Sequence, residues 1–160
     1  MKVSEAIEKR RSIRKFKDEK VPYEDLKDLV EAGRLAPSAD NKQLIEYLIV
    51  DRSDLEKEVF KHTEWAGRIE WSPSKDERPR AYILLLIDKD AMEGGWYKYD
   101  VGGASENISL AATSKGLGTC ILGAIDREAI KSILNIPDEK RIDLAIAVGV
   151  PDQTSTSVDS

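Results

Sequence analysis

The sequence predicts a single α+β domain, in which a central sheet of four to five mixed or antiparallel strands is flanked by helices. The main observation is that short apolar segments alternate with segments whose apolar residues recur at helical spacing. Residues 1–151 also contain no internal repeat and no change of composition that would mark a second domain. A length of 160 residues, of which 41% are hydrophobic and 34% charged, suits one domain with a hydrophobic core. The segment 152–160 is expected to be a polar tail that is disordered or docked elsewhere.

Two helices are predicted before the first strand. The first begins at Ser4, whose hydroxyl can cap it, and ends near Ser12. The second opens at Pro22 and runs to about Leu35, with apolar residues at helical spacing. Residues 36–43 follow as a loop, because proline and turn-forming polar residues are concentrated there.

The rest of the chain alternates strands and helices. The predicted strands are 46–51, 81–88, 119–122 and 142–150, and the predicted helices are 53–71, 100–115 and 126–134. The polar loop 72–80 is a candidate for mobility over a site, and 92–99 is a connection rich in glycine and aromatic residues. Because helix 100–115 is rich in small residues, we expect it to be either the central buried helix or a subunit contact.

The composition excludes several classes of function. A formal net charge of −5 argues against a general nucleic-acid-binding protein. No apolar run is long enough to cross a bilayer and none resembles a secretory signal, so we expect a cytoplasmic protein without a membrane partner. Cys120 is the single cysteine and is expected in the core, and His62, the single histidine, is expected on the surface or on a helix face. We therefore expect neither a metal centre nor a Ser-His-Asp triad.

A basic cluster at the end of the first predicted helix is the main candidate binding site. Residues 1–20 carry eight Lys and Arg against four Asp and Glu, a local charge of 8 − 4 = +4. Within them Arg10, Arg11 and Arg14 surround Ser12, and guanidinium groups match phosphate oxygens bidentately. We expect a small phosphorylated ligand there. A solvated helix end and a nucleic-acid contact through residues 9–20 are the alternatives.

Four stretches, taken in order, resemble the family of FMN-dependent nitroreductases. The first two are Arg10–Arg14, with Phe16 and a Val-Pro pair behind it, and Ala36–Gln43, which alone would be read as a plain turn. The others run from Asp100 through Leu122 and Gly123, and from Ile146 to Pro151. The resemblance covers residues 2–151. It implies a nitroreductase-like fold and an interlocked homodimer.

The resemblance also implies that FMN is bound where two subunits meet. The residues that would hold its phosphate and ribityl end are Arg10, Arg11, Ser12 and Arg14. The residues that would contact the same flavin from the other subunit are Pro37, Ser38, Ala39, Asn41 and Gln43. The backbone of Leu122 and Gly123 would lie near the isoalloxazine ring.

The implied activity is that of a flavin-dependent NAD(P)H oxidoreductase with a ping-pong cycle. NADH or NADPH would reduce the flavin, and a small nitroaromatic, quinone or similar conjugated acceptor would then take two electrons. No catalytic side chain is required, because flavin N5 carries the chemistry. The aromatic residues Trp96, Tyr97 and Tyr99 would either border the acceptor or simply pack. Two other activities are open, a non-catalytic FMN-binding module and a reductive dehalogenase or flavin-modifying relative.

Two departures from the family pattern affect the expected site. Leu44 and Ile45 replace the Pro-Trp pair that often follows Gln43, which alters one wall of the site. Family members also continue past the last strand into a basic segment that reaches the phosphate. We expect that the sequence is truncated after Ser160; the alternative is a member that binds flavin with fewer cations. Without that segment, Arg10, Arg11 and Arg14 are the main charges available to the phosphate.

Overall fold

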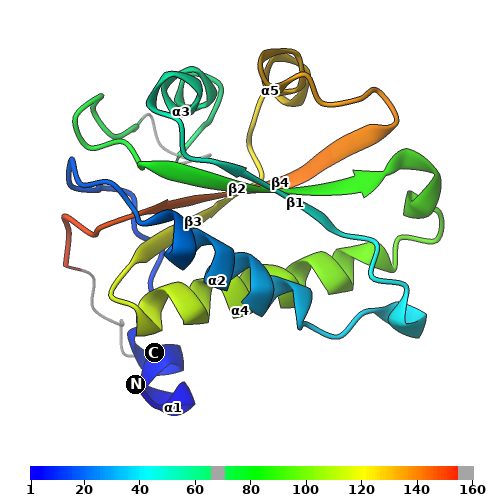
Figure 1. Cartoon of the computed structure of the whole chain (residues 1–160), viewed down its shortest axis with the longest axis horizontal. Helices are drawn as coiled ribbons and strands as arrows, with labels where there is room; N and C mark the ends of the chain where they lie inside the picture. The colour runs from blue at the N-terminus through cyan, green and yellow to red at the C-terminus, as the bar shows by residue number, and fades with distance from the viewer. Residues whose placement is uncertain (66–70, 155–160) are drawn as a thin grey trace.

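The computed structural model describes residues 1–65 and 71–154, and its centre is a four-stranded sheet (Figure 1). The strands are β1 (Glu46–Val50), β2 (Ala81–Asp88), β3 (Gly118–Leu122) and β4 (Lys140–Gly149). Their order is β1-β2-β4-β3, and every neighbouring pair is antiparallel. This confirms the predicted sheet and decides between mixed and antiparallel.

Helices cover both faces of the sheet, as predicted. On one face lie α2 (Tyr23–Arg34) and α4 (Tyr97–Ser114), and on the other α3 (Ser53–Phe60) and α5 (Arg127–Leu134) (Figure 1). Side chains of β2 alternate between two cores, because successive residues of a strand point to opposite faces. Tyr82 and Leu84 pack with α3 and α5, whereas Ile83 and Leu85 pack with α2 and α4. Within the described residues no helix is both long and apolar enough to cross a bilayer.

Three helices have boundaries that differ from the prediction. Helix α1 (Val3–Lys9) begins after Lys2 and not at Ser4, and it ends at Arg10, whose φ of −57° and ψ of 129° are not helical. The predicted helix 53–71 is wrong beyond Phe60, because Thr63 leaves the helix to bridge Ile125; residues 66–70 lie outside the described part of the chain.

The third difference concerns the connection 92–99. It is shorter than predicted, since a 3₁₀ turn covers Lys89–Met92 and α4 already begins at Tyr97. A second 3₁₀ turn, Ala39–Asn41, lies inside the predicted loop 36–43. The predicted cap of α5 is confirmed, since the Asp126 side chain accepts the Ala129 N–H at 3.1 Å.

The segment after α1 runs along the free edge of β3. Ser12 forms a parallel bridge with Thr119, and the Ile13 N–H donates to the Thr119 carbonyl at 2.8 Å. Further along, the buried Phe16 ring lies against the backbone of Gly149 at the end of β4. The basic cluster is therefore fixed to the sheet by backbone hydrogen bonds and by packing on glycine.

We expect Gly149→Ala to destabilise the protein by about 2 kcal/mol, as overpacking usually does. A Cβ at this position would lie 2.7 Å from Phe16 Cδ1 and 3.2 Å from Phe16 Cβ, so the ring has to move. Urea unfolding measures the loss. Gly103→Ala is the matched control, because its Cβ would meet only Ala36 Cβ at 3.9 Å and alanine favours a helix interior. Equal stability of the two variants would contradict the packing described here.

Candidate functional site

The guanidinium groups of the basic cluster are held in different ways. Arg10 Nε lies 3.1 Å from a carboxylate oxygen of Glu106 on α4. Arg11 donates through Nη1 to backbone carbonyls of Glu8 and Arg10, while its Nε is buried with no partner in the described part of the chain. Arg14 Nε donates to the carbonyl of Trp65 at 3.2 Å. The cluster therefore sits just after the end of α1, as predicted, with one buried donor left free.

The polar tail, expected to be disordered or docked elsewhere, is docked on the same segment as far as it is described. The Gln153 side-chain carbonyl accepts the N–H groups of Arg14 at 2.8 Å and Lys15 at 2.9 Å. The Asp152 N–H donates to the Lys15 carbonyl at 2.9 Å. Residues 152 and 153 therefore help to hold the backbone that carries Arg14.

The loop 72–80 is tied down at several points. Its Glu77 pairs with Lys15 at 2.7 Å and accepts the Phe16 N–H through its carbonyl at 2.9 Å. The hydrogen bond from Lys15 lowers the pKa of Glu77 to about 2, with further donors in Ser74. These bonds anchor the loop beside the basic cluster; its mobility stays a prediction.

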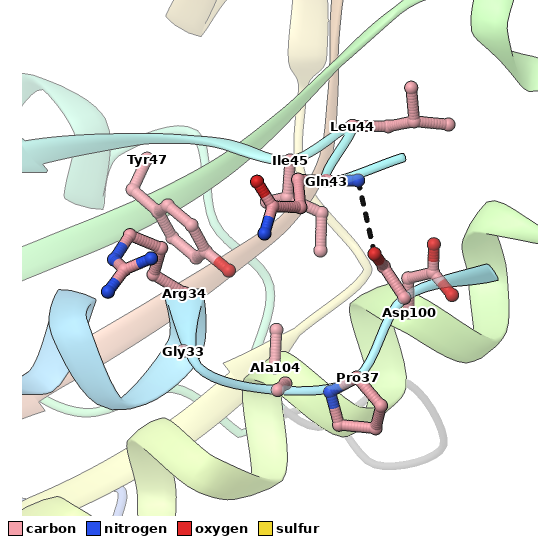
Figure 2. Close-up of a pocket in the computed structure, with 11 residues that line it drawn as sticks. Gly33, Arg34, Pro37, Gln43, Leu44, Ile45, Tyr47, Asp100 and Ala104 are labelled. Carbon is pink, nitrogen blue, oxygen red and sulfur yellow. Dashed lines mark hydrogen bonds between the residues drawn. The ribbon is translucent and has the colours of Figure 1, made fainter. Parts of the chain in front are cut away.

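The second candidate stretch, Pro37–Gln43, is a compact and strained loop. Asp40, Asn41 and Gln43 have φ values of 53°, 54° and 51°, in the left-handed region that residues other than glycine rarely adopt. The loop is held by the Gln43 N–H, which donates to Ser38 Oγ at 3.1 Å (Figure 2). Because strained backbone persists only where its surroundings enforce it and is concentrated at binding sites, the loop is a stronger candidate than the sequence suggested.

A pocket of about 240 Å³ separates this loop from α2 and α4 (Figure 2). Its walls include Gly33 and Ala104, which are small, and Tyr47, whose pKa is raised to about 12 by burial. Leu44 and Ile45, which replace the family's usual Pro-Trp pair, line it directly. The pocket thus lies immediately behind the predicted flavin-contacting residues.

Asp100 belongs to this site and was not among the predicted site residues. Its carboxylate accepts the Ala39 N–H at 3.0 Å and so links α4 to the loop. Sequence reasoning missed it because an acidic residue in the first turn of a helix is ordinary. A signal was present, however: Asp100, Ala104 and Ile108 are spaced four apart and all three are buried, so the sequence places a carboxylate on a buried stripe.

One chain brings some of the predicted site residues together but not all. Both stretches touch α4, the first at Glu106 and the second at Asp100. These two positions are six residues apart in the helix, which is about 9 Å along the axis and about 120° around it. Figure 1 shows α1 and the loop near opposite ends of α4. A ligand contacting both stretches therefore has to reach across two faces of this helix or involve a second copy.

Leu122 and Gly123 lie at the end of β3, on the strand that the basic segment follows. Leu122 is buried, and the Gly123 carbonyl accepts a hydrogen bond from Arg127 at 3.1 Å. Arg14 and these two residues are thus on the same edge of the sheet, whereas Pro37–Gln43 leads into β1 at the opposite edge. The structure groups the backbone of β3 with the basic cluster.

Cys120 and His62 could also carry chemistry, but the structure places each of them among structural contacts. Cys120 lies buried in β3, as predicted, and burial raises the pKa of its thiol. His62 follows α3, with Nδ1 3.8 Å from Asp126. Within residues 1–65 and 71–154 no three His, Cys, Asp or Glu side chains are grouped to hold a metal ion.

Comparison with known proteins gives a consistent result. A sequence model of the nitroreductase family matches residues 7–150. A protein from Methanothermobacter thermautotrophicus, assigned as NADH dehydrogenase/NAD(P)H nitroreductase, is 30% identical, with 94% of this chain and 78% of the relative covered. An iodotyrosine deiodinase from Thermotoga neapolitana is also 30% identical, over 90% of this chain and 86% of the relative.

Among solved structures, one described as a nitroreductase in complex with FMN, from Desulfovibrio desulfuricans, is 29% identical with a TM-score of 0.77. That match covers 100% of this chain and 92% of the other. The fold and the sequence therefore point to the same family.

Proposed function

Because the chain belongs to the nitroreductase family and is an oxidoreductase of that family, we propose that it binds FMN where two copies meet and reduces small conjugated acceptors with NADH or NADPH. The observation that carries this proposal is the pairing of two features that contact α4 at separate positions: a basic cluster with an unpaired buried donor, and a strained loop. Nitroaromatics and quinones are the acceptor classes proposed.

The basic cluster fits the phosphate of FMN chemically. Arg11 has a buried Nε–H without a partner in the described residues, and the Ser12 side chain is exposed. Arg10 can turn from Glu106 towards a phosphate, since that ion pair is part-exposed and exposed pairs contribute little to stability. We propose that Arg10, Arg11, Ser12 and Arg14 hold the phosphate and the ribityl chain.

The homodimer is supported by surface composition as well as by the split site. Helix α1 exposes Val3 and Ile7 at 73% and 56%, and Ile121 on β3 is 39% exposed. Exposed apolar residues on the two elements that adjoin the basic cluster favour a protein interface there. We propose that this interface brings the partner's copy of Pro37–Gln43 to the basic cluster.

Bound FMN would supply hydride acceptance and two-electron donation in a ping-pong cycle. The chain's own part is to bind and orient. Pro37, Ser38, Ala39, Asn41 and Gln43 would border the flavin, and the backbone of Leu122 and Gly123 would stabilise charge on its ring with an N–H group. No side chain has to transfer a proton for this role.

A second candidate activity is reductive removal of a halogen. It is favoured by the 30% identity to a protein named iodotyrosine deiodinase over 90% of this chain. Release of iodide from an iodinated phenol in the presence of reduced protein would distinguish it from nitro or quinone reduction.

The proposal is tested by an absorption spectrum of the purified protein, followed by anaerobic titration with NADH and NADPH. We expect a yellow protein with one FMN per chain, bleached by one equivalent of at least one nicotinamide and reoxidised by a quinone. A colourless protein that does not take up added FMN would contradict it. Flavin that binds but is not reduced by either nicotinamide would instead indicate a non-catalytic binding module.

A further inference from the structure

The carboxylate of Asp100 is only half satisfied. The residue is 6% exposed and one oxygen, Oδ1, accepts the Ala39 N–H at 3.0 Å. Its other oxygen, Oδ2, is buried and has no hydrogen-bond partner in the described part of the chain. Leaving such an acceptor unpaired is unfavourable, and more so for a charged group. A ligand that donates to Oδ2 recovers this free energy.

Asp100 lies where two hollows of the surface meet. Pockets of about 390 Å³ and about 300 Å³ share Ala39, Trp96 and Asp100 in their walls. Figure 2 shows the Asp100 side chain on α4, beside the backbone that runs on from Pro37. These volumes are in the range of sites for small organic molecules.

Two exposed aromatic rings form the outer wall. Trp96 and Tyr99 are 67% and 75% exposed, and their ring centroids lie 5.7 Å apart at 45°. The first lines both hollows, and Tyr99 lines the smaller one. Aromatic faces attract organic cations and also stack on flat rings. Large exposed aromatics beside a buried charge therefore favour a ligand that is both flat and cationic.

The charges around the larger hollow also favour a cationic ligand. Its walls carry Asp40, Glu93 and Asp100 against one cation, Lys42, so the balance is 1 − 3 = −2. Lys42 Nζ lies 3.7 Å from a carboxylate oxygen of Asp40 and so offsets that group first. An anionic ligand is repelled here. A metal ion is not favoured either, since the described residues contain no group of three suitable ligands.

We propose that this place, with Asp100 as its floor and Trp96 and Tyr99 as its wall, binds an organic ammonium group attached to a flat or apolar body. The ammonium donates to Asp100 Oδ2 while the body stacks on the aromatic rings. The site itself is formed by residues of one chain. Its role as selector of ammonium-bearing electron acceptors rests on the proposed function, because Pro37–Ala39 would border the flavin.

Calorimetric titration of the flavin-loaded full chain with three matched probes tests this. Benzylammonium, benzyl alcohol and benzoate share one ring and differ in charge. We expect benzylammonium to bind at least 10-fold more tightly than benzyl alcohol and benzoate to bind most weakly. Equal affinity for the ammonium and the alcohol in the unaltered protein would overturn the proposal without recourse to any variant.

Asp100→Asn then identifies the residue responsible. Asparagine keeps an oxygen for the Ala39 N–H but presents an amide donor to the ligand, so we expect the preference for the ammonium to disappear. Glu93→Gln removes one exposed charge of the same sign and should change the affinity less than 3-fold. An undiminished preference in Asp100→Asn would also overturn the proposal. A colourless protein that still prefers benzylammonium would count against the flavin proposal alone.

Discussion

Protein carrying Arg10→Ala together with Arg14→Ala is expected to purify without flavin and to bind added FMN about 100-fold more weakly. Each charge-assisted hydrogen bond to a phosphate contributes about 1.5–3 kcal/mol, so the loss of two costs about 3 kcal/mol or more. Tenfold in affinity corresponds to about 1.4 kcal/mol. Quenching of FMN fluorescence on binding gives the dissociation constant.

The matched control for this variant is Lys9→Ala together with Lys17→Ala. It also removes two positive charges from the basic segment, but neither lysine is proposed to contact the phosphate. We expect it to retain flavin within a few-fold of the unaltered affinity. If both double variants lose flavin equally, the segment acts through general charge and not through guanidinium contacts. Stoichiometric flavin in Arg10→Ala with Arg14→Ala would place the phosphate elsewhere.

Arg78→Ala is expected to lower the free energy of unfolding by about 3 kcal/mol, because it leaves a buried carboxylate without its main partner. Arg78 Nε donates to both oxygens of Glu56, at 3.0 and 3.2 Å, and the Glu56 side chain is 2% exposed. Arg80 remains at 3.9 Å and limits the loss. Urea unfolding gives the value. Arg52→Ala is the control, since its ion pair with Asp54 is exposed and should contribute about 0.5 kcal/mol.

The cost of Arg78→Ala should also depend on pH. Burial raises the pKa of Glu56 above its ordinary 4.5, and the ion pair with Arg78 opposes that rise. Without Arg78 the pKa of the folded state rises further. When the pKa of Glu56 is higher in the folded state, protonation of Glu56 stabilises the folded form. This stabilisation is lost as the pH rises from 4.5, the ordinary pKa, through the pKa of the folded state. The deficit of the variant should therefore be smallest in acid and grow towards neutral pH. A deficit independent of pH would exclude Glu56 as its cause.

The strands were predictable because their apolar runs are local signals. β2 is buried at every position from Ala81 to Ile87, so its sequence is continuously apolar and could not be mistaken for a loop. The helix ends were harder, since tertiary contacts decide them. Arg10 could continue α1 by its own propensity, but the bond from Ile13 to Thr119 pulls the chain onto β3.

The candidate site was only partly predictable for the same reason. Residue types indicated Arg10–Arg14, and the resemblance to the family indicated Pro37–Gln43. Neither the Glu106 contact of Arg10 nor the strain of the loop follows from a local sequence pattern. Asp100 was overlooked as a site residue because its role depends on Ala39, 61 positions away in the sequence. Whether the two stretches contact one flavin is a prediction that a dimer experiment has to decide.

The most direct test of the shared site uses two damaged chains in one dimer. One chain carries Arg10→Ala and Arg14→Ala, and the other carries Ala39→Trp, whose bulk fills the flavin side of the loop. Each homodimer should lack flavin. The heterodimer, isolated through two different tags, contains one site built from the two unaltered stretches, and we predict one FMN per dimer. A flavin-free heterodimer, or chains that do not associate, would contradict a flavin site completed by a second subunit.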